Sequence, residues 1–291
     1  MRLEIHQFPD ILDDSIVYGI RKCLSFEAIS YVWGQPLFTH PIYLTAGMLH
    51  LTSNLAAVLM AVRLPDCHRY VWADAICINQ TDVVEKAHQV KRMGGIYNHA
   101  QRVLIWLGIN TDGLASETFQ AIVNTSKLPQ DVEAERAALL RLATREWFTR
   151  VWVVQESRGS SPLMIWGIHQ MELREFENRL QHLFTHRIRL DHRWLLFPSS
   201  FVDVFHFMSW LRPMSCSDQR DRVYALQGLI YQSACSLSHE IRLLEPDYHK
   251  SAEQLFLETA CIFLSHGKAA RVLSCVNRPH GTTAVNRILP S

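Results

Sequence analysis

The chain lacks the segments that would place it in or across a membrane. None of its apolar runs reaches the about 18 residues that a transmembrane helix requires. The residues that follow Met1 do not form the apolar core of a secretory signal. With 48% hydrophobic residues in a length of 291, the chain can nevertheless bury a large core. We therefore expect a soluble, cytoplasmic protein without a membrane span.

An excess of charge of one sign is also missing. The 29 Lys and Arg residues nearly balance the 28 Asp and Glu residues, which leaves a net charge of +1. Nucleic-acid binding requires clustered positive charge, so this balance argues against a nucleic-acid partner. The seven cysteines are an odd number and none lies in a C-x-x-C motif, which favours reduced thiols inside the cell over a disulfide framework.

Signatures of the commonest enzyme classes are absent. The chain has no Walker A loop, no G-x-G-x-x-G turn and no G-x-S-x-G elbow. His182 and His186 are spaced i, i+4, with His192 beyond them, but no Glu or Cys stands beside them in a zinc motif. Cys23 and Cys77 have no histidine base next to them in the sequence. The sequence thus predicts neither a metal site nor a bound cofactor.

Strands alternate with helices in the first third of the chain. Aromatic and β-branched runs predict strands, and apolar residues at helical spacing predict helices between them. The strands are expected at 26–33, 42–45, 70–73 and 102–108, and the helices at 51–63 and 81–97. This alternation is typical of an α/β fold with a mostly parallel central sheet.

Helices dominate from residue 110 onward. They are expected at 131–145, 173–185, 201–211 and 222–231, with a single strand at 163–166. Ser251 and Gln254 form a capping-box signature that opens a further helix to about Leu264. No repeat or Gly/Ser/Pro linker divides the chain, so the pattern favours one α/β domain with large helical insertions and a helical C-terminal part.

The segment Trp72–Gln80 (WADAICINQ) runs from a strand directly into polar residues. Ligands of open α/β sheets bind beyond the carboxyl ends of strands, and Asp74, Asn79 and Gln80 would lie there. These side chains are therefore candidates for ligand binding. An equally good interpretation is that Asp74 and Asn79 cap helices and brace the loop.

The segment Arg150–Glu156 (RVWVVQE) is expected to form a short helix. Trp152 and Glu156 would share one face at i, i+4 spacing, and a carboxylate against an indole is suited to acid–base or electrostatic chemistry. The alternative is a structural salt bridge from Glu156 to Arg150 or Arg220. On these residues alone the salt bridge is the favoured interpretation.

The segment Asp218–Leu226 (DQRDRVYAL) places alternating charges at the start of a helix. Such a pattern indicates a buried network of ion pairs more than it indicates chemistry. Arg220 and Asp221, together with Arg150, are accordingly expected to brace the structure.

The order of these motifs resembles the fungal heterokaryon-incompatibility (HET) domain. The resemblance begins at Ala28–Gly34 (AISYVWG) and continues through the three segments above. It also includes the following shorter matches: Met93–Tyr97, Ile105–Gly108, Trp147–Glu156 and Pro246–Tyr248. It implies an N-terminal lead-in at 1–25, a HET domain at 26–264 and a C-terminal tail at 265–291.

The resemblance also implies a function and a site. HET domains are associated with non-self recognition and programmed cell death in fungi, and they are proposed to be remote relatives of Toll/interleukin-1 receptor (TIR) domains. Many TIR domains cleave NAD+ with a glutamate in a Trp-Cys-x-x-Glu helix, and Trp152–Glu156 keeps that spacing without the Cys. The likeness implies a TIR/flavodoxin-like fold in which Glu156 is catalytic and NAD+ is the substrate.

Ligand contacts follow from the same likeness. Ser30, Tyr31, Trp33 and Trp152 would contact the ligand, with Tyr31 or Trp33 stacking on nicotinamide. Activation would come from self-association or from another incompatibility protein. Two alternatives stay open: a non-enzymatic signalling scaffold, and an accessory protein recruited into secondary metabolism.

Overall fold

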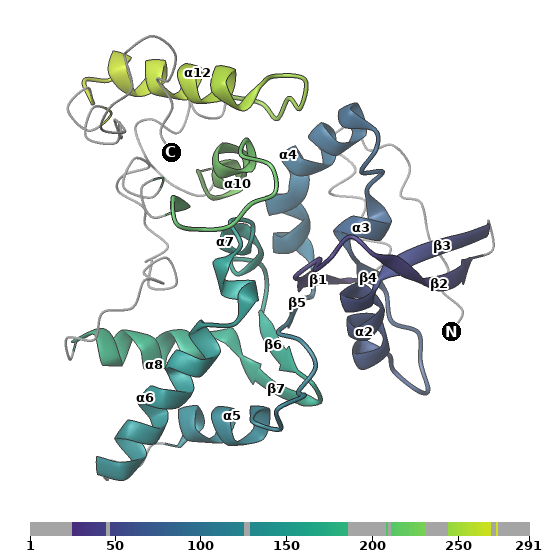
Figure 1. The fold of residues 1–291 in the computed structure, drawn as a ribbon, viewed down its shortest axis with the longest axis vertical. Coiled ribbons are helices and arrows are strands. Elements are labelled where there is room, and N and C mark those ends of the chain that lie inside the picture. Colours follow the sequence, from purple (N-terminus) through teal and green to yellow (C-terminus); the bar gives the residue numbers. More distant parts are fainter. Residues whose placement is uncertain are drawn as a thin grey trace. The chain divides into compact units, whose positions relative to one another are not determined.

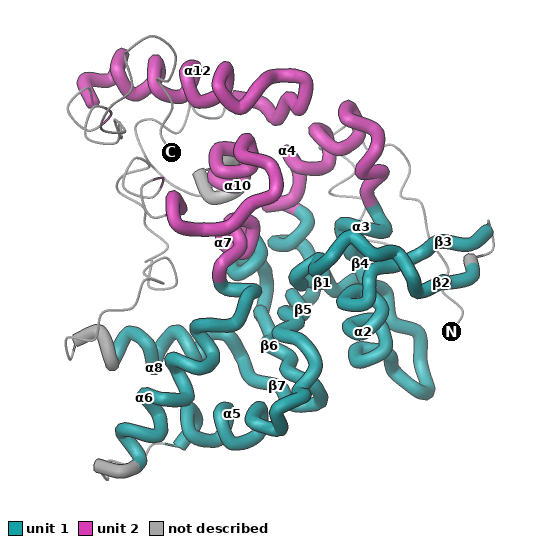
Figure 2. Tube along the Cα trace, in the orientation of Figure 1, with its two compact units in different colours: residues 1–77, 96–148, 156–189 teal, residues 78–95, 149–155, 190–291 magenta. Residues whose placement is uncertain are grey.

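The computed structural model describes residues 25–44, 47–124, 129–185, 208, 211–230, 244–268 and 272. The chain forms two compact units (Figure 2). Unit 1 comprises 1–77, 96–148 and 156–189, and unit 2 comprises 78–95, 149–155 and 190–291.

Unit 1 contains a five-stranded sheet (Figure 1). Its strands are β1 (Glu27–Tyr31), β4 (Val71–Trp72), β5 (Arg102–Trp106), β6 (Leu163–Trp166) and β7 (His169–Glu172). The first four run parallel to one another, and β7 returns antiparallel to β6. The prediction of an α/β fold with a mostly parallel sheet is therefore confirmed.

The strand order identifies the switch point of this sheet, where the order of the strands reverses. The strands lie in the order β4-β1-β5-β6-β7, so that numbered along the chain within this sheet they read 2-1-3-4-5. The chain leaves β1 toward one edge and then crosses to the other side of β1 to form β5. Open α/β sheets bind ligands outside the carboxyl ends of their strands at such a switch point, which here lies between β1 and β5.

Helices of unit 1 include α2 (Ser53–Val62), α3 (Asp74–Cys77), α5 (Ala115–Val123), α6 (Pro129–Ala143) and α8 (Leu173–Thr185), with a 3-10 turn η1 (Glu146–Thr149). Helix α2 packs its apolar stripe against one face of the sheet. Leu55, Val58 and Leu59 join a buried cluster with Ile29 of β1 and Leu104 of β5. Burial of these faces anchors the strand ends that carry the first two motifs.

A hairpin precedes α2 where the sequence pattern predicted only one strand. Strands β2 (Phe38–Leu44) and β3 (Gly47–Thr52) pair antiparallel. The helix predicted from residue 51 begins at Ser53, because the Thr52 hydroxyl caps it by accepting from the Leu55 amide. The apolar run in β3 resembles a helix start, since short apolar segments do not reveal their period.

Unit 2 is largely helical in the part that is described. Its helices are the first part of α4 (Val83–His99), most of α7 (Val153–Glu156), α10 (Asp221–Ile230) and α12 (Ala252–Ser265). The capping box of α12 is confirmed, with Ser251 and Gln254 in reciprocal hydrogen bonds. The expected helix at 201–211 lies outside the described residues, apart from positions 208 and 211.

The helix expected at 81–97 starts later in the structure, as α4. The Asp82 carboxylate accepts from the amides of Val84 and Glu85 at 2.9 and 3.0 Å. A carboxylate at this end is favoured by the helix dipole. The helix therefore begins at Val83.

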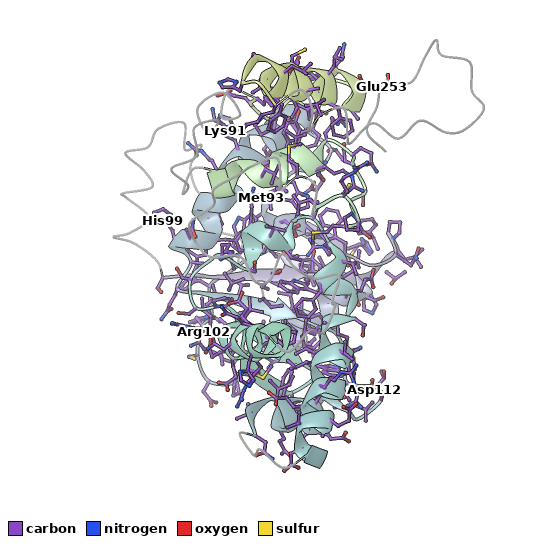
Figure 3. All side chains as sticks on the ribbon, turned by 90° about the vertical axis from the view of Figure 1, so that its left-hand side faces the viewer. Lys91, Met93, His99, Arg102, Asp112 and Glu253 are labelled. Carbon is purple, nitrogen blue, oxygen red and sulfur yellow. The ribbon has the colours of Figure 1, made fainter. Side chains whose placement is uncertain are left out.

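The described part of the chain contains no helix that is both long and apolar enough to cross a membrane. It also contains no group of three His, Cys, Asp or Glu side chains placed to hold a metal ion. Arg102 of β5, labelled in Figure 3, lies 3.7 Å from Glu172 of β7, and both of these side chains are partly exposed.

Gly159 occupies a close-packed turn after α7, and we expect its replacement by Ala to destabilise the chain. A Cβ there would meet a methyl of Val103 in β5 and lie 2.7 Å from the backbone oxygen of Tyr97. Overpacking against backbone costs about 1–3 kcal/mol or more. Denaturant unfolding should show this loss for Gly159→Ala. Gly95 lies in an exposed part of α4, where an added Cβ would meet no neighbouring atom within 4 Å. Gly95→Ala should therefore gain about 0.5–1 kcal/mol of stability. Equal changes in stability for the two variants would contradict the close packing at Gly159.

Candidate functional site

A buried chain of hydrogen bonds joins the first and third motifs in unit 1. The Trp147 indole donates to Ser30 Oγ at 2.6 Å, and the Ser30 hydroxyl donates to Glu156 Oε2 at 2.5 Å. Ser30 is the penultimate residue of β1, Trp147 belongs to η1, and Glu156 ends α7. Residues separated by 126 positions in the sequence thus meet near the carboxyl end of the central strand.

All three members of this chain are buried, each being 1% exposed. Buried polar groups need hydrogen-bond partners to offset the loss of water, and here each donor finds an acceptor. The direction of the bonds is fixed, because the indole can only donate and the serine then gives its single proton to the carboxylate. The arrangement holds Oε2 of Glu156 in one orientation close to the switch point of the sheet.

A second, more exposed contact joins the first and second motifs. The Trp33 indole donates to Asp74 Oδ2 at 2.8 Å, while Asp74 Oδ1 accepts from the Ala75 amide. Asn54 at the start of α2 donates to the Val32 backbone oxygen at 3.0 Å. Trp33 and Asp74 are both half-buried. They lie just beyond the carboxyl ends of β1 and β4, where the second motif was expected to carry its polar side chains.

The remaining predicted ligand residues lie elsewhere. Tyr31 is 2% exposed and belongs to the buried cluster that faces α2. Asn79 organises the turn before α4. Its Oδ1 accepts from the backbone amide and the hydroxyl of Thr81, and its backbone amide donates to the Glu85 carboxylate. Gln80 lies in the same turn of unit 2.

Cys77 is poorly suited to act as a nucleophile. Burial raises the pKa of its thiol to about 11, against a smaller lowering by the backbone of Ala73. Because the thiolate is the reactive form, almost none of it is present at neutral pH. Cys23, the other thiol considered, lies outside the described residues.

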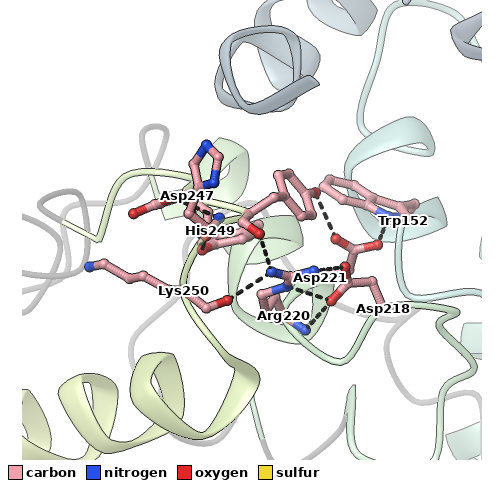
Figure 4. Close-up of polar contacts among 9 residues, drawn as sticks. Trp152, Asp218, Arg220, Asp221, Asp247, His249 and Lys250 are labelled. Atoms are coloured by element: carbon pink, nitrogen blue, oxygen red, sulfur yellow. Dashed lines mark hydrogen bonds and ion pairs between the residues drawn. The ribbon is translucent and has the colours of Figure 1, made fainter. Parts of the chain in front are cut away.

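Unit 2 contains a separate polar network around Asp221 (Figure 4). Asp221 Oδ2 accepts from the Trp152 indole at 3.0 Å, and Oδ1 accepts from the Tyr248 hydroxyl at 2.8 Å. Burial raises the pKa of Asp221, and the two hydrogen bonds oppose that rise. Trp152 lies just before helix α7, which begins at Val153. Its indole donates to Asp221, and both residues belong to unit 2.

Arg220 connects its own segment to residues 248–250 beside this network. Its guanidinium binds Asp218 through Nε and Nη2, and its Nη1 donates to the backbone oxygens of Tyr248 and Lys250 at 2.5 and 2.7 Å. Burial would raise the pKa of Asp218, but the hydrogen bonds from Arg220 outweigh it and hold that pKa low. Arg220 therefore has Asp218 as its carboxylate partner, and the backbone of Arg150 forms an isolated bridge with Ser215.

Two important members of these networks received no role from the sequence. Trp147 and Tyr248 both stand inside segments that carry the family resemblance, but an aromatic residue in an apolar run indicates only a core position. Membership in a motif was the one signal that could have marked them. The indole N–H and the phenol O–H each point to a polar residue far away in the chain, which no local pattern reveals.

Tyr248→Phe should destabilise unit 2 more at neutral pH than at acid pH. The Tyr248 hydroxyl donates to the Asp221 carboxylate, and a hydrogen bond to a charged group contributes about 1.5–3 kcal/mol. Asp221 already has a raised pKa in the folded state, so its ionisation lowers stability as pH rises. Loss of the hydroxyl raises that pKa further. The difference in unfolding free energy between Tyr248→Phe and wild type should therefore shrink as the pH falls toward 4 and Asp221 becomes protonated in both proteins.

A matched control exists for this experiment. The Tyr224 hydroxyl exchanges hydrogen bonds with the backbone of Asp247, which does not titrate. Phenylalanine also keeps the Tyr248 ring, on which Lys86 Nζ and Arg220 Cζ lie 4.4 and 5.0 Å from the centroid. Unfolding curves measured from pH 4 to pH 8 should give a constant loss for Tyr224→Phe. A pH-independent loss for Tyr248→Phe as well would contradict the assignment.

The fold and these networks define a class: an α/β protein whose parallel sheet carries a buried carboxylate at its switch strand. Residues 26–156 match the family model described as heterokaryon incompatibility protein (HET). This stretch of the chain is therefore similar to a HET domain, and it contains β1, the Trp33–Asp74 pair and the Trp147–Ser30–Glu156 chain. The expected continuation of the domain to Leu264 stays a prediction.

One curated relative supports the same family. Heterokaryon incompatibility protein 6, OR allele, from Neurospora crassa is 39% identical over 101 residues, which cover 30% of this chain and 15% of the relative. The chain thus aligns with only a small part of that protein. No solved structure matches the chain.

Proposed function

We propose that the chain acts in fungal incompatibility, as a domain that converts non-self recognition into a cellular response. The proposal is supported by the HET match and by the name of the Neurospora relative. Because the chain aligns with 15% of that relative, the recognition step and the partner that triggers it belong to the proposal. Programmed cell death is the response that we propose.

The chemistry proposed for this response is cleavage of NAD+ by Glu156. One observation carries it: Ser30 Oγ lies 2.5 Å from Glu156 Oε2 at the carboxyl end of β1. The strand order 2-1-3-4-5 is that of flavodoxin-like sheets, whose ligand binds at this switch point. The order supports the TIR/flavodoxin-like assignment, although β7 runs antiparallel.

In this proposal Glu156 accepts hydrogen bonds from the ribose hydroxyls of NAD+ and stabilises the developing positive charge of an oxocarbenium-like transition state. The bond between C1′ and the nicotinamide nitrogen breaks, and nicotinamide leaves with the bonding pair. Water then adds to C1′ and releases a proton. Ser30 positions the carboxylate, and the half-buried Trp33 offers a ring on which nicotinamide can stack.

A second candidate function is a non-enzymatic signalling scaffold. Glu156 is 1% exposed, whereas a catalytic carboxylate must be accessible to its substrate. The burial of Glu156 therefore favours this second candidate. In that case the three indole contacts, to Ser30, Asp74 and Asp221, hold the motifs in place and the domain acts by binding partners.

Overexpression in a fungal host separates the two candidates. If Glu156 cleaves NAD+, the wild-type chain lowers cellular NAD+ and viability, and Glu156→Ala abolishes both effects at equal protein level. Toxicity that is equal in wild type and Glu156→Ala, with NAD+ unchanged, would reject the catalytic role and favour the scaffold.

A further inference from the structure

Among the described residues, the buried side-chain N–H groups without an acceptor come from three residues of unit 1. They are Trp106 Nε1, Trp166 Nε1, and both Nε and Nη2 of Arg145. Trp106 ends β5 and Trp166 ends β6. A buried donor that lacks an acceptor costs free energy, so each such group requires an explanation.

Two of these residues are in direct contact. The Arg145 guanidinium lies over the Trp166 ring, with Cζ 3.6 Å from the ring centroid. Trp166 is 0% exposed and also forms a T-shaped ring pair with Phe119. The contact therefore places the guanidinium of Arg145 against the indole of Trp166 at the carboxyl end of β6.

The two guanidinium donors form a fork. Nε and Nη2 lie on one edge of the planar group, and their N–H bonds are nearly parallel, which is the geometry that binds two oxygens of one anion. Turns hold the Arg145 backbone, because its amide donates to Leu142 and its carbonyl accepts from Phe148. The fork is thus presented by a fixed segment.

The nearest carboxylate does not satisfy this fork. Asp112 Oδ2 lies 3.8 Å from Arg145 Nη2, which is too long for a hydrogen bond. The other oxygen of Asp112 accepts from the Leu114 amide at 3.2 Å, and Asp112 lies at the surface (Figure 3). Burial lowers the pKa of Arg145, with Asp112 opposing that shift only in part.

We propose that Arg145 and Trp166 form a binding site for a phosphoryl group. The fork would hold two oxygens of the anion and the Trp166 N–H a third. The indole stacks on one face of the guanidinium, so its N–H lies outside the guanidinium plane. A tetrahedral phosphate can reach donors in both places, whereas a planar carboxylate held by the fork stays in one plane.

The site differs from the one proposed for catalysis and requires no reaction at Glu156. Arg145 follows α6 and Trp166 ends β6, so the phosphoryl site adjoins the carboxyl edge of the same sheet. The phosphoryl group can belong to free phosphate or to a nucleotide. Both sources share the recognition chemistry, and the experiment distinguishes them.

The test is a calorimetric titration of the full chain at constant ionic strength. Inorganic phosphate, ADP and acetate are the three probes. We expect saturable binding of phosphate or ADP that weakens at least about tenfold in Arg145→Lys, which keeps the charge and loses the fork. Asp112→Asn should tighten binding, because it removes a competing negative charge from a surface position.

Two matched variants control for general effects. Arg136→Gln removes an exposed arginine that pairs with Glu133. Trp106→Phe removes a second indole N–H that, among the described residues, is buried without an acceptor. The Trp106 side chain lies in the cluster facing α2, on the opposite face from Trp166. Both variants should bind phosphate like wild type, whereas Trp166→Phe should bind more weakly.

The binding results can be distinguished from a failure of the proposed NAD+ cleavage. Tighter binding of ADP than of phosphate, with the same dependence on Arg145, assigns the site to a nucleotide, and equal binding assigns it to free phosphate. The same results should appear in the Glu156→Gln background. No saturable binding, an equal affinity for acetate, or equal effects of Arg145→Lys and Arg136→Gln would overturn the site.

Discussion

Glu156→Gln should reduce the release of nicotinamide from NAD+ by at least about 100-fold while leaving the fold intact. The amide keeps the size of the side chain, and its oxygen can still accept the hydrogen bond that Ser30 donates to Oε2. What it loses is the negative charge that stabilises an oxocarbenium-like transition state. The measurement is the turnover of NAD+ by purified chain, with the thermal midpoint determined for each variant.

Ser30→Ala provides the companion measurement. It removes the donor that orients the Glu156 carboxylate but leaves its charge, so we expect a loss of about tenfold in kcat. Glu156→Gln and Ser30→Ala should therefore differ in activity at similar stability. Turnover by Glu156→Gln within a few-fold of wild type would show that the carboxylate braces the fold and does not act on the substrate.

Trp147→Ala should destabilise the chain by about 3–5 kcal/mol, the range for removing a large aromatic side chain from a core. Trp147 is 1% exposed and packs edge-on against Phe148, with ring centroids 4.8 Å apart. Its indole also donates to Ser30 at 2.6 Å. The variant thus loses buried area and one donor of the Ser30–Glu156 chain. Denaturant unfolding and hydrogen exchange of β1 measure the effect.

Trp147→Phe separates packing from hydrogen bonding. The phenyl ring keeps most of the contact with Phe148 and loses only the N–H, for which we expect about 0.5–1.5 kcal/mol from the hydrogen bond, plus the smaller ring. A loss for Trp147→Ala below about 1 kcal/mol would contradict its assigned place in the core.

The class of fold could be predicted because buried parallel strands have a strong local pattern. Glu27–Tyr31 and Arg102–Trp106 are apolar, β-branched and aromatic, and each precedes a turn. The strand β3 could not be predicted in this way, since Gly47–Thr52 runs directly into the helix that Thr52 caps. Whether a short apolar segment forms a strand depends on the strand with which it pairs, and that pairing is a tertiary contact.

The candidate site was only partly predictable for the same reason. Glu156 and Ser30 were selected from their motifs, but their contact spans 126 positions and follows from the topology of the sheet. The expected pairing of Trp152 with Glu156 assumed a continuous helix. Helix α7 begins only at Val153, and the Trp152 indole donates to Asp221. Indole N–H groups have single partners, and no spacing rule identifies those partners.

The catalytic role of Glu156 is tested most directly by proton NMR of NAD+ incubated with the purified wild-type chain. If Glu156 is catalytic, nicotinamide and ADP-ribose signals grow in equal amounts, at a rate proportional to chain concentration, and Glu156→Gln abolishes this growth. Unchanged NAD+ signals with a folded chain, or equal product formation by wild type and Glu156→Gln, would contradict that role.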